Sequence, residues 1–180
     1  LLSDYCDITV REETAAKVLG ALTGKNIDVV CDPVMLLDSS EWEDVMEDCE
    51  PGDKPYILYY SLGLPDKGIV EMCRWLSSKK KLRTVVLHNS PANPRGCISD
   101  NSCDPRRWMR YLKDADTIVT PSFHGVCFSL IFRNNFICLK NQKNSDVSSR
   151  LSDLLERVGL WERCMGAFEE QATTGIDWAV

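Results

Sequence analysis

The chain has 180 residues, a formal net charge of -6 and a sequence pI near 5.0. This acidic balance argues against a surface for nucleic acid or an anionic membrane, although a few local cations can still hold an anionic small substrate. With 44% hydrophobic and 27% charged residues, the composition is ordinary for a globular protein with one α/β domain or slightly more. No transmembrane segment and no secretory leader are predicted.

The 9 cysteines are scattered along the chain. There is no C-x-x-C pair and there are only 2 histidines, so neither a zinc site nor another metal or cofactor is expected. A disulfide between Cys97 and Cys103 is conceivable but not favoured. Four cysteines lie within apolar runs and are predicted to be small buried hydrophobes of a reduced cytoplasmic protein: Cys6, Cys31, Cys127 and Cys138.

Strand and helix signals alternate from the start of the chain. The run "YCDITV" predicts a strand that ends at Arg11. The segment "EETAAKVLGALTG" has helical spacing, with Val18 and Leu22 on one apolar face and Gly24 as the C-terminal cap. The run "IDVVCDP" predicts a second strand, and Asp32 with Pro33 is expected to fix the turn that ends it.

The middle of the chain continues the alternation. Ser40 and Glu43 predict a capping box for a short helix. The run "YILYYS" predicts a third strand, "PDKGIVEMCRWLSSKKK" a helix, and "RTVVLH" a fourth strand. The loop "NSPANPRGCISDNSC" follows, and loops of such length in compact domains are usually functional or mobile.

The last part of the chain completes the pattern. Asp104 and Pro105 predict the N-cap and first residue of the helix "PRRWMRYLKDA", and "TIVT" predicts the fifth strand. A helix is predicted after "SFHG", then a sixth strand at "FICL" and a helix in "DVSSRLSDLLERVG" that Gly159 caps. Together these elements predict a single Rossmann-like domain over residues 1–180: a doubly wound parallel sheet of about six strands, with helices on both faces.

Ligands of such sheets bind at the carboxyl ends of the strands. This rule selects candidate residues that follow each predicted strand: Arg11, Asp32, Tyr60, Ser61, His88, Asn89, Thr120 to His124, Lys140 and Asn141.

The stretch "SFHG" is the most informative candidate because it fits an anion site at a helix N-terminus. His124 could act there as a general acid or base, and Gly125 could let a ligand approach the backbone. A histidine that only caps the helix or lies in the core explains the residue at least as well. Arg11 beside Glu12 is likewise explained by a surface ion pair. The sequence lacks G-x-G-x-x-G, Walker and G-x-S-x-G motifs, so a nucleotide cofactor is not expected.

Several segments in order resemble the polysaccharide pyruvyl transferase family: "DITVREETAAKVLGALTGKNIDVVCDPVMLL", "YILYYSLG", "DPRRWMRYLKDADTIVTPSFHGVCFSLIFRNNF" and "SSRLSDLLERVGL". The resemblance implies a GT-B-like enzyme with two Rossmann-like halves. The chain resembles the C-terminal, donor-binding half, trimmed at both ends, with the N-terminal half as its missing partner.

The family resemblance also implies a reaction. A transferase would move the pyruvyl group of phosphoenolpyruvate onto hydroxyls of a saccharide and form a ketal in a bacterial exopolysaccharide or cell-wall polymer. We would expect such an enzyme in the cytoplasm, or at the inner face of the membrane. Phosphoenolpyruvate is the donor substrate, so no separate cofactor is implied.

Residue by residue, the resemblance makes His124 the catalytic histidine. It assigns donor binding to Arg11, Ser122, Phe123 and Gly125. The strand-end rule adds candidate substrate contacts at Tyr60, Ser61, Asn89 and Asn141. Pro121 stands where relatives commonly have Asp or Asn, and Val126 where they commonly have Thr, so the donor or acceptor could differ. Arg150 is also present, but the sequence does not decide whether it reaches the site.

Two other functions remain open on the sequence. A GT-B-like glycosyltransferase that uses a nucleotide sugar would need an acidic residue to hold the nucleotide, for which Glu71 is a weak candidate. A non-catalytic Rossmann-like binding module is the other alternative.

Overall fold

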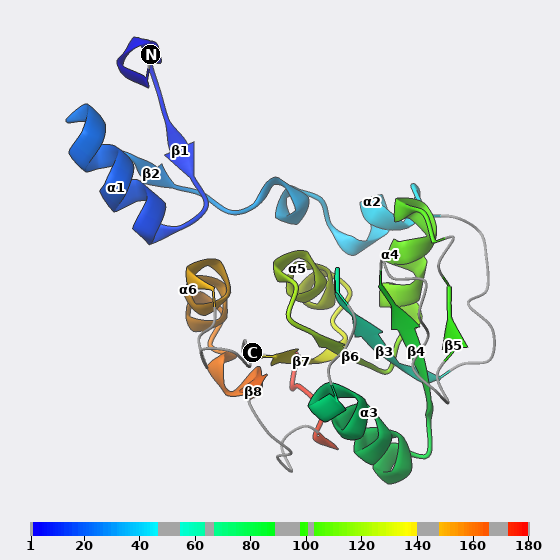
Figure 1. The fold of residues 1–180 in the computed structure, drawn as a ribbon. Helices are drawn as coiled ribbons and strands as arrows, with labels where there is room; N and C mark the ends of the chain where they lie inside the picture. The colour runs from blue at the N-terminus through cyan, green and yellow to red at the C-terminus, as the bar shows by residue number, and fades with distance from the viewer. Residues whose placement is uncertain are drawn as a thin grey trace.

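A six-stranded parallel sheet forms the centre of the computed structural model (Figure 1). The structure describes residues 2–46, 55–63, 67–88, 98–100, 103–139, 148–165 and 173–179. From one edge of the sheet to the other the strands are β5 (Ile98–Ser99), β4 (Arg83–Leu87), β3 (Tyr56–Tyr60), β6 (Thr117–Thr120), β7 (Asn135–Leu139) and β8 (Cys164–Met165).

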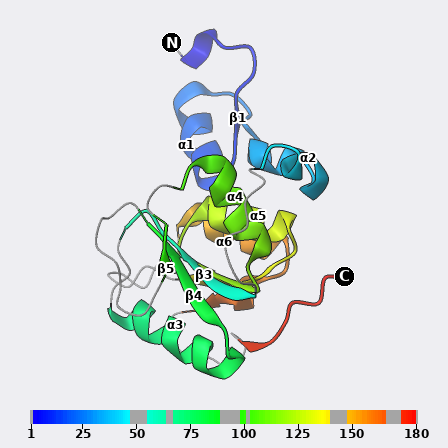
Figure 2. The same ribbon diagram turned by 90° about the vertical axis from the view of Figure 1, so that its right-hand side faces the viewer.

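Helices cover both faces of this sheet, as Figures 1 and 2 show. α3 (Lys67–Lys80) lies on one face, and α4 (Pro105–Asp114), α5 (Phe123–Ile131) and α6 (Ser149–Arg157) lie on the other. The alternation of side chains along a strand explains this arrangement. Ile57 and Tyr59 of β3 pack with Leu76 of α3, whereas Leu58 packs in a second cluster with α4, α5 and α6. The predicted doubly wound α/β architecture is therefore confirmed.

The composition of the sheet differs from the prediction. The first two predicted strands are β1 (Thr9–Val10) and β2 (Asp28–Val29), which pair only with each other in a separate two-stranded parallel sheet. α1 (Glu13–Thr23) connects them, and a 3-10 helix, η1 (Leu2–Asp4), precedes them. The two-residue strands β5 and β8 complete the large sheet instead, at its edges. Both are too short to show a periodic apolar pattern, and so the sequence did not reveal them.

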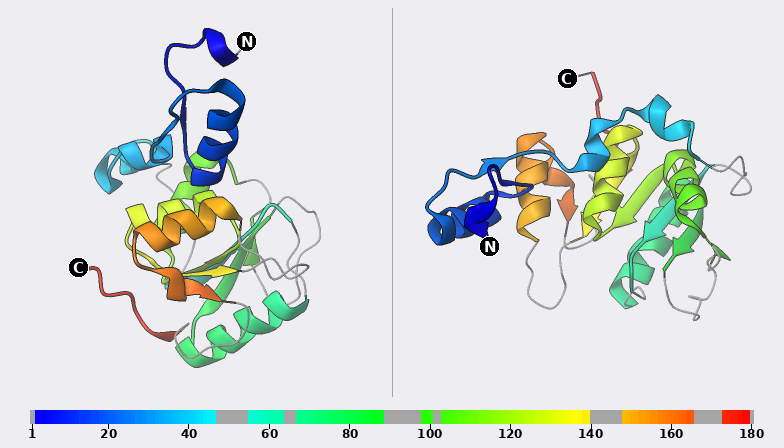
Figure 3. Two further views of the ribbon diagram at one scale, coloured as in Figure 1. Left: turned by 90° about the vertical axis from the view of Figure 1, so that its left-hand side faces the viewer. Right: turned by 90° about the horizontal axis from the view of Figure 1, so that it is seen from above.

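Polar contacts connect the β1–α1–β2 segment to α6, and both views in Figure 3 place α1 beside that helix. The Ser149 hydroxyl donates to the Glu12 carboxylate at 2.5 Å, and Arg157 forms an ion pair with Glu13 at 2.9 Å. The backbone N–H of Glu13 donates to Asp153 at 3.1 Å. These contacts hold the end of β1 next to the start of α6.

The predicted apolar face of α1 is not buried. Val18 is 54% exposed and Leu22 is 72% exposed, and α1 contains no buried residue. The helix ends as predicted at Gly24, whose φ of 69° is the left-handed conformation that glycine adopts readily. A neighbouring prediction was wrong: Cys6 and Cys31 are exposed, because the strands that would bury them are shorter than the apolar runs.

Buried thiols were predicted correctly in the large sheet and its helices. Cys127 and Cys138 are both fully buried. Cys103 is half-buried, and the disulfide that the sequence made conceivable stays untested because Cys97 lies outside the described residues.

The predicted capping residues of α4 are confirmed, and those of α2 are not. Asp104 caps α4 by accepting from the Arg107 N–H, and Pro105 is its first residue. The predicted capping box at Ser40 and Glu43 was wrong by two residues. Its members are Asp38 and Glu41, at the start of α2 (Ser39–Glu43).

Two further 3-10 helices complete the described structure, η2 (Pro33–Leu36) and η3 (Trp161–Arg163). Within the described ranges, no helix combines the length and apolar character needed to cross a bilayer.

Candidate functional site

The start of α5 is fixed by hydrogen bonds at the carboxyl end of β6. The Thr120 hydroxyl donates to the Tyr60 carbonyl at 2.7 Å and accepts the Ser122 N–H at 3.0 Å. Ser122 is the N-cap, and its hydroxyl accepts the Gly125 N–H at 3.3 Å. These bonds anchor the turn between β6 and α5, so Phe123 and His124 open the helix in a fixed orientation.

The same hydrogen bonds show which backbone donors can face a ligand. The N–H groups of Ser122 and Gly125 already have acceptors, whereas those of Phe123 and His124 have none among the described residues. The first N–H groups of a helix carry partial positive charge and bind anions. An anion at this helix end would therefore be held by the amides of residues 123 and 124.

Gly125 was expected to let a ligand approach the backbone, but the structure gives a different reason for a glycine at this position. A Cβ atom at this position would lie 2.7 Å from Oγ1 and 2.9 Å from Cγ2 of the buried Thr120. The space beside Gly125 is therefore filled by Thr120 and is not open to a ligand. Val126, which follows Gly125, is fully buried in the core. The valine that stands here in place of the relatives' threonine therefore removes no polar contact from the open side of the site. Pro121 is half-buried.

Asp32 connects the small sheet to α5. It follows β2, and its side chain is only 2% exposed. Its Oδ1 accepts the Val34 N–H at 3.1 Å, and its Oδ2 forms an ion pair with Arg11. The Nε2 atom of His124 lies 3.7 Å from the same Oδ2. Burial alone would raise the pKa of Asp32, but the Val34 N–H, Arg11 and His124 together hold this pKa below its ordinary value. Asp32 is thus a carboxylate that pairs with Arg11 and lies within ion-pair distance of His124.

The ring of Phe123 brings two cations together. Cζ of Arg11 lies 5.9 Å from the ring centroid, and Cζ of Arg150 lies 5.4 Å from it. The His124 ring is 5.6 Å away in an edge-to-face arrangement. Arg150 is the second residue of α6, and its Nε is 4.0 Å from Glu12. No local spacing links α6 to α5, so the sequence did not show that Arg150 reaches the site.

The remaining predicted residues lie at different depths. The Tyr60 hydroxyl is hydrogen-bonded to Ser122, and burial raises the pKa of this phenol. Ser61 is half-buried and accepts the Gly63 N–H at 3.2 Å. His88 is buried at the end of β4. Lys140 and the predicted contacts Asn89 and Asn141 lie outside the described residues.

Cys127 follows His124 by about one helical turn, but it is not suited to nucleophilic chemistry. Burial raises the pKa of the Cys127 thiol to about 12, so it stays protonated near neutral pH.

The side chains of the site that can react or bind a ligand are the partly exposed ones. The side chains of Arg11, His124 and Arg150 are 39%, 47% and 38% exposed, respectively. Two cations, two helix amides and one imidazole suit an anionic ligand that exchanges a proton.

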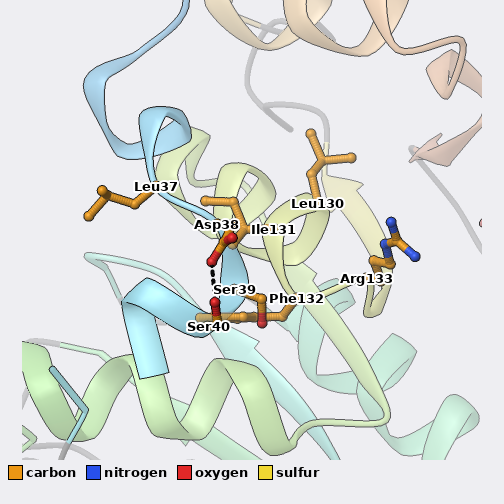
Figure 4. A pocket seen from close by; sticks show the side chains of 8 residues that line it. All are labelled: Leu37, Asp38, Ser39, Ser40, Leu130, Ile131, Phe132 and Arg133. Atoms are coloured by element: carbon orange, nitrogen blue, oxygen red, sulfur yellow. Dashed lines mark hydrogen bonds between the residues drawn. The ribbon is translucent and has the colours of Figure 1, made fainter. Parts of the chain in front are cut away.

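A pocket of about 480 Å³ lies elsewhere, at the opposite end of α5 (Figure 4). It is lined by Leu37, Asp38, Ser39, Ser40, Leu130, Ile131, Phe132 and Arg133. The helix rises about 1.5 Å per residue, which separates its last residue from His124 by roughly 10 Å. Carbonyl groups face outward at that end of a helix, so it disfavours an anion. This pocket is separate from the candidate site.

Comparison with known proteins identifies the family. The sequence model of polysaccharide pyruvyl transferases matches residues 1–143. The chain belongs to the polysaccharide pyruvyl transferase family. The matched range contains Arg11, Asp32 and the "SFHG" stretch, whereas Arg150 lies beyond it. A search of curated proteins found no match.

A solved structure confirms the relation to the GT-B-like fold. The chain is similar to the UDP-GlcNAc 2-epimerase of Methanocaldococcus jannaschii, solved in complex with UDP-GlcNAc and UDP. The TM-score is 0.51 and the sequence identity 13%, and the match covers 82% of this chain and 48% of the epimerase chain. The chain thus spans about half the length of that structure. At this identity the likeness concerns the fold.

Proposed function

We propose that this member of the pyruvyl transferase family provides the donor-binding half of an enzyme that transfers the pyruvyl group of phosphoenolpyruvate to a saccharide. The observation that carries the proposal is the placement of Arg11 and His124 on one buried carboxylate, Asp32, at the N-terminus of α5. An anion-binding group and a proton-transferring group are thereby brought close to the same carboxylate. Phosphoenolpyruvate needs both, because it is an anion whose methylene carbon must be protonated.

The proposed reaction balances as follows. A proton adds to the methylene carbon of the donor, and C2 becomes electrophilic. Two saccharide hydroxyls lose their protons and form C–O bonds to C2, and the bond from C2 to the phosphate oxygen breaks. One hydroxyl proton restores the general acid that protonated the methylene carbon, and the other leaves with inorganic phosphate. The product is a ketal with a methyl group and a free carboxylate.

In this reaction His124 is the general acid and Arg11 binds the anionic donor. Asp32 holds both in position, since its second oxygen faces both side chains and its first is fixed by the Val34 N–H. The amides of Phe123 and His124 complete the anion site. Ser122 and Gly125 act through the helix start that they fix, and Tyr60 supports Ser122 from β3.

A nucleotide-sugar transferase is the alternative enzyme, and the epimerase of similar fold was solved with UDP. The acidic residue that this alternative requires is not well placed. Glu71 is an exposed residue of α3, which covers the face of the large sheet opposite to α5 (Figure 1). The positions of the candidate residues therefore favour phosphoenolpyruvate.

We place the reaction in the cytoplasm and assign the acceptor-binding side to the N-terminal half that the family resemblance implies. A reducing compartment agrees with the exposed thiols of Cys6 and Cys31. The product would be a pyruvylated exopolysaccharide or cell-wall polymer of a bacterium.

A titration of nitrogen-labelled complete natural protein with phosphoenolpyruvate tests the donor site. We expect amide shifts at Phe123, His124 and Arg11. UDP is the matched competitor, and it should leave these amides unchanged. Binding of UDP without any response to phosphoenolpyruvate would support the nucleotide-sugar alternative, and shifts confined to α3 would show that the site is misplaced.

A further inference from the structure

Arg150 and Arg11 come from distant parts of the chain and meet on one aromatic ring. Arg11 follows β1 of the small sheet, and Arg150 lies in the first turn of α6. Their guanidinium carbons lie 5.9 and 5.4 Å from the centroid of the Phe123 ring, which is itself buried. Each cation has a carboxylate nearby, Asp32 for Arg11 and Glu12 for Arg150, but both guanidinium groups remain more than a third exposed and can still bind an anion.

The partners of the two arginines differ in an informative way. Arg11 is paired with the buried Asp32, whereas the Nε of Arg150 is 4.0 Å from Glu12, which is too long for a hydrogen bond. Glu12 already accepts the Ser149 hydroxyl at 2.5 Å. Arg157, on the same helix, makes a direct 2.9 Å contact with Glu13. Arg150 is thus held near the site while its side chain, 38% exposed, is not committed to a close carboxylate.

We propose that Arg150 is a second donor-binding residue and that Arg11 and Arg150 bind the two anionic ends of the donor, one arginine to each end. The inference rests on the proposed function. Phosphoenolpyruvate carries a phosphate and a carboxylate, and the planar guanidinium fork matches either group with two hydrogen bonds. The site then selects small phospho-carboxylates over ligands that carry a single anionic group.

Binding measurements on the complete natural protein test this arrangement. The dissociation constants of phosphoenolpyruvate, inorganic phosphate and pyruvate are measured by calorimetry for the wild type, Arg11→Gln, Arg150→Gln and Arg157→Gln. Arg150→Gln should weaken phosphoenolpyruvate binding by about 10- to 100-fold, because a charge-assisted contact to one end is lost. Among the ligands with one anionic group, Arg150→Gln should weaken either phosphate or pyruvate, and Arg11→Gln should weaken the other.

Arg157→Gln is the matched control, since it removes an arginine of α6 that pairs with the α1 segment but does not contact Phe123. Its phosphoenolpyruvate affinity should stay within about twofold of the wild type. An equal loss in both α6 variants would mean that loosening the helix causes the effect and would overturn the inference.

Other outcomes separate this inference from the proposed function. If Arg11→Gln weakens phosphoenolpyruvate binding and Arg150→Gln does not, the proposed function stands and the role of Arg150 is refuted. If both variants weaken the same one-anion ligand and spare the other, the two-end arrangement is refuted. If the wild type does not bind phosphoenolpyruvate, both proposals are refuted.

Discussion

The Nε2 atom of His124 lies 3.7 Å from the Oδ2 atom of Asp32, across the junction between the small sheet and the large one. This distance exceeds that of a hydrogen bond, so Asp32 attracts the imidazole in its protonated form without locking it in place. Asp32 also pairs with Arg11 through the same oxygen. The carboxylate that follows β2 therefore lies within ion-pair distance of both Arg11 and His124.

Replacement of His124 by glutamine should reduce phosphate release from phosphoenolpyruvate at least about 100-fold in the complete natural protein with a saccharide acceptor, because the proton donor is lost. The free energy of unfolding should change by less than about 0.5 kcal/mol, since the His124 side chain is 47% exposed. A phosphate-release assay and urea denaturation measure the two effects. Full activity in His124→Gln would refute the proposed role of this residue.

Asp32→Asn should lower the free energy of unfolding by about 1 kcal/mol near neutral pH, because it removes a charged acceptor from Arg11, itself 39% exposed. The pKa of Asp32 is lowered from 3.8 on folding, so its stabilising contribution is complete above that value and is lost as the pH falls through the lowered pKa. The difference between variant and wild type should be constant from about pH 5 to 8 and shrink below the ordinary pKa. Urea denaturation from pH 8 down to about pH 2.5 measures it. A difference that grows in acid would contradict the assignment.

Gly125→Ala should destabilise the protein by about 1 to 3 kcal/mol, reduced by up to about 1 kcal/mol through the better helix propensity of alanine. The cause is the 2.7 Å approach of the new Cβ to the buried Oγ1 of Thr120. Gly63→Ala is the control, because nothing lies within 4 Å of a Cβ at that position. Thermal denaturation compares the two. Equal stability of both variants would show that the contact at Gly125 is relieved at no cost.

Two substitutions at Ser122 separate its capping role from the charge of the site. Ser122→Ala should cost about 1 kcal/mol of stability, because the Gly125 N–H loses its acceptor. Ser122→Asp should keep the cap and the stability but weaken phosphoenolpyruvate binding at least about tenfold, since it adds a negative charge beside an anion site. Denaturation and calorimetry give the two values. Unchanged donor affinity in Ser122→Asp would place the anion elsewhere.

The sequence predicted the parts of the fold that depend on local patterns. The four longest strands, the caps at Gly24 and Asp104, and the doubly wound class follow from periodicity and capping residues, and all are confirmed. The pairing of strands is not local. Nothing in the residues of β1 and β2 distinguishes a strand of the large sheet from one of a separate small sheet, so the sheet was assigned incorrectly.

In the candidate site too, a local rule predicted some residues, whereas others depend on packing between distant segments. The rule for strand ends selected Arg11, Asp32 and His124, and the structure brings these three side chains together. The orienting role of Asp32 could not be predicted, because its residue type fits a turn equally well. Arg150 and the Thr120 contact of Gly125 depend on how helices pack on the sheet, which the spacing of residues along one segment does not reveal.

The contacts of Glu12 and Glu13 with α6 respond differently to ionic strength. The pair between Glu13 and Arg157 is largely exposed, and dissolved ions screen exposed pairs strongly over a Debye length of about 8 Å at physiological salt. Arg11 lies next to Glu12, whereas His124 belongs to the large sheet. Salt therefore weakens the pair between Glu13 and Arg157, while the hydrogen bonds of Ser149 with Glu12 and of the Glu13 N–H with Asp153 keep Arg11 close to His124.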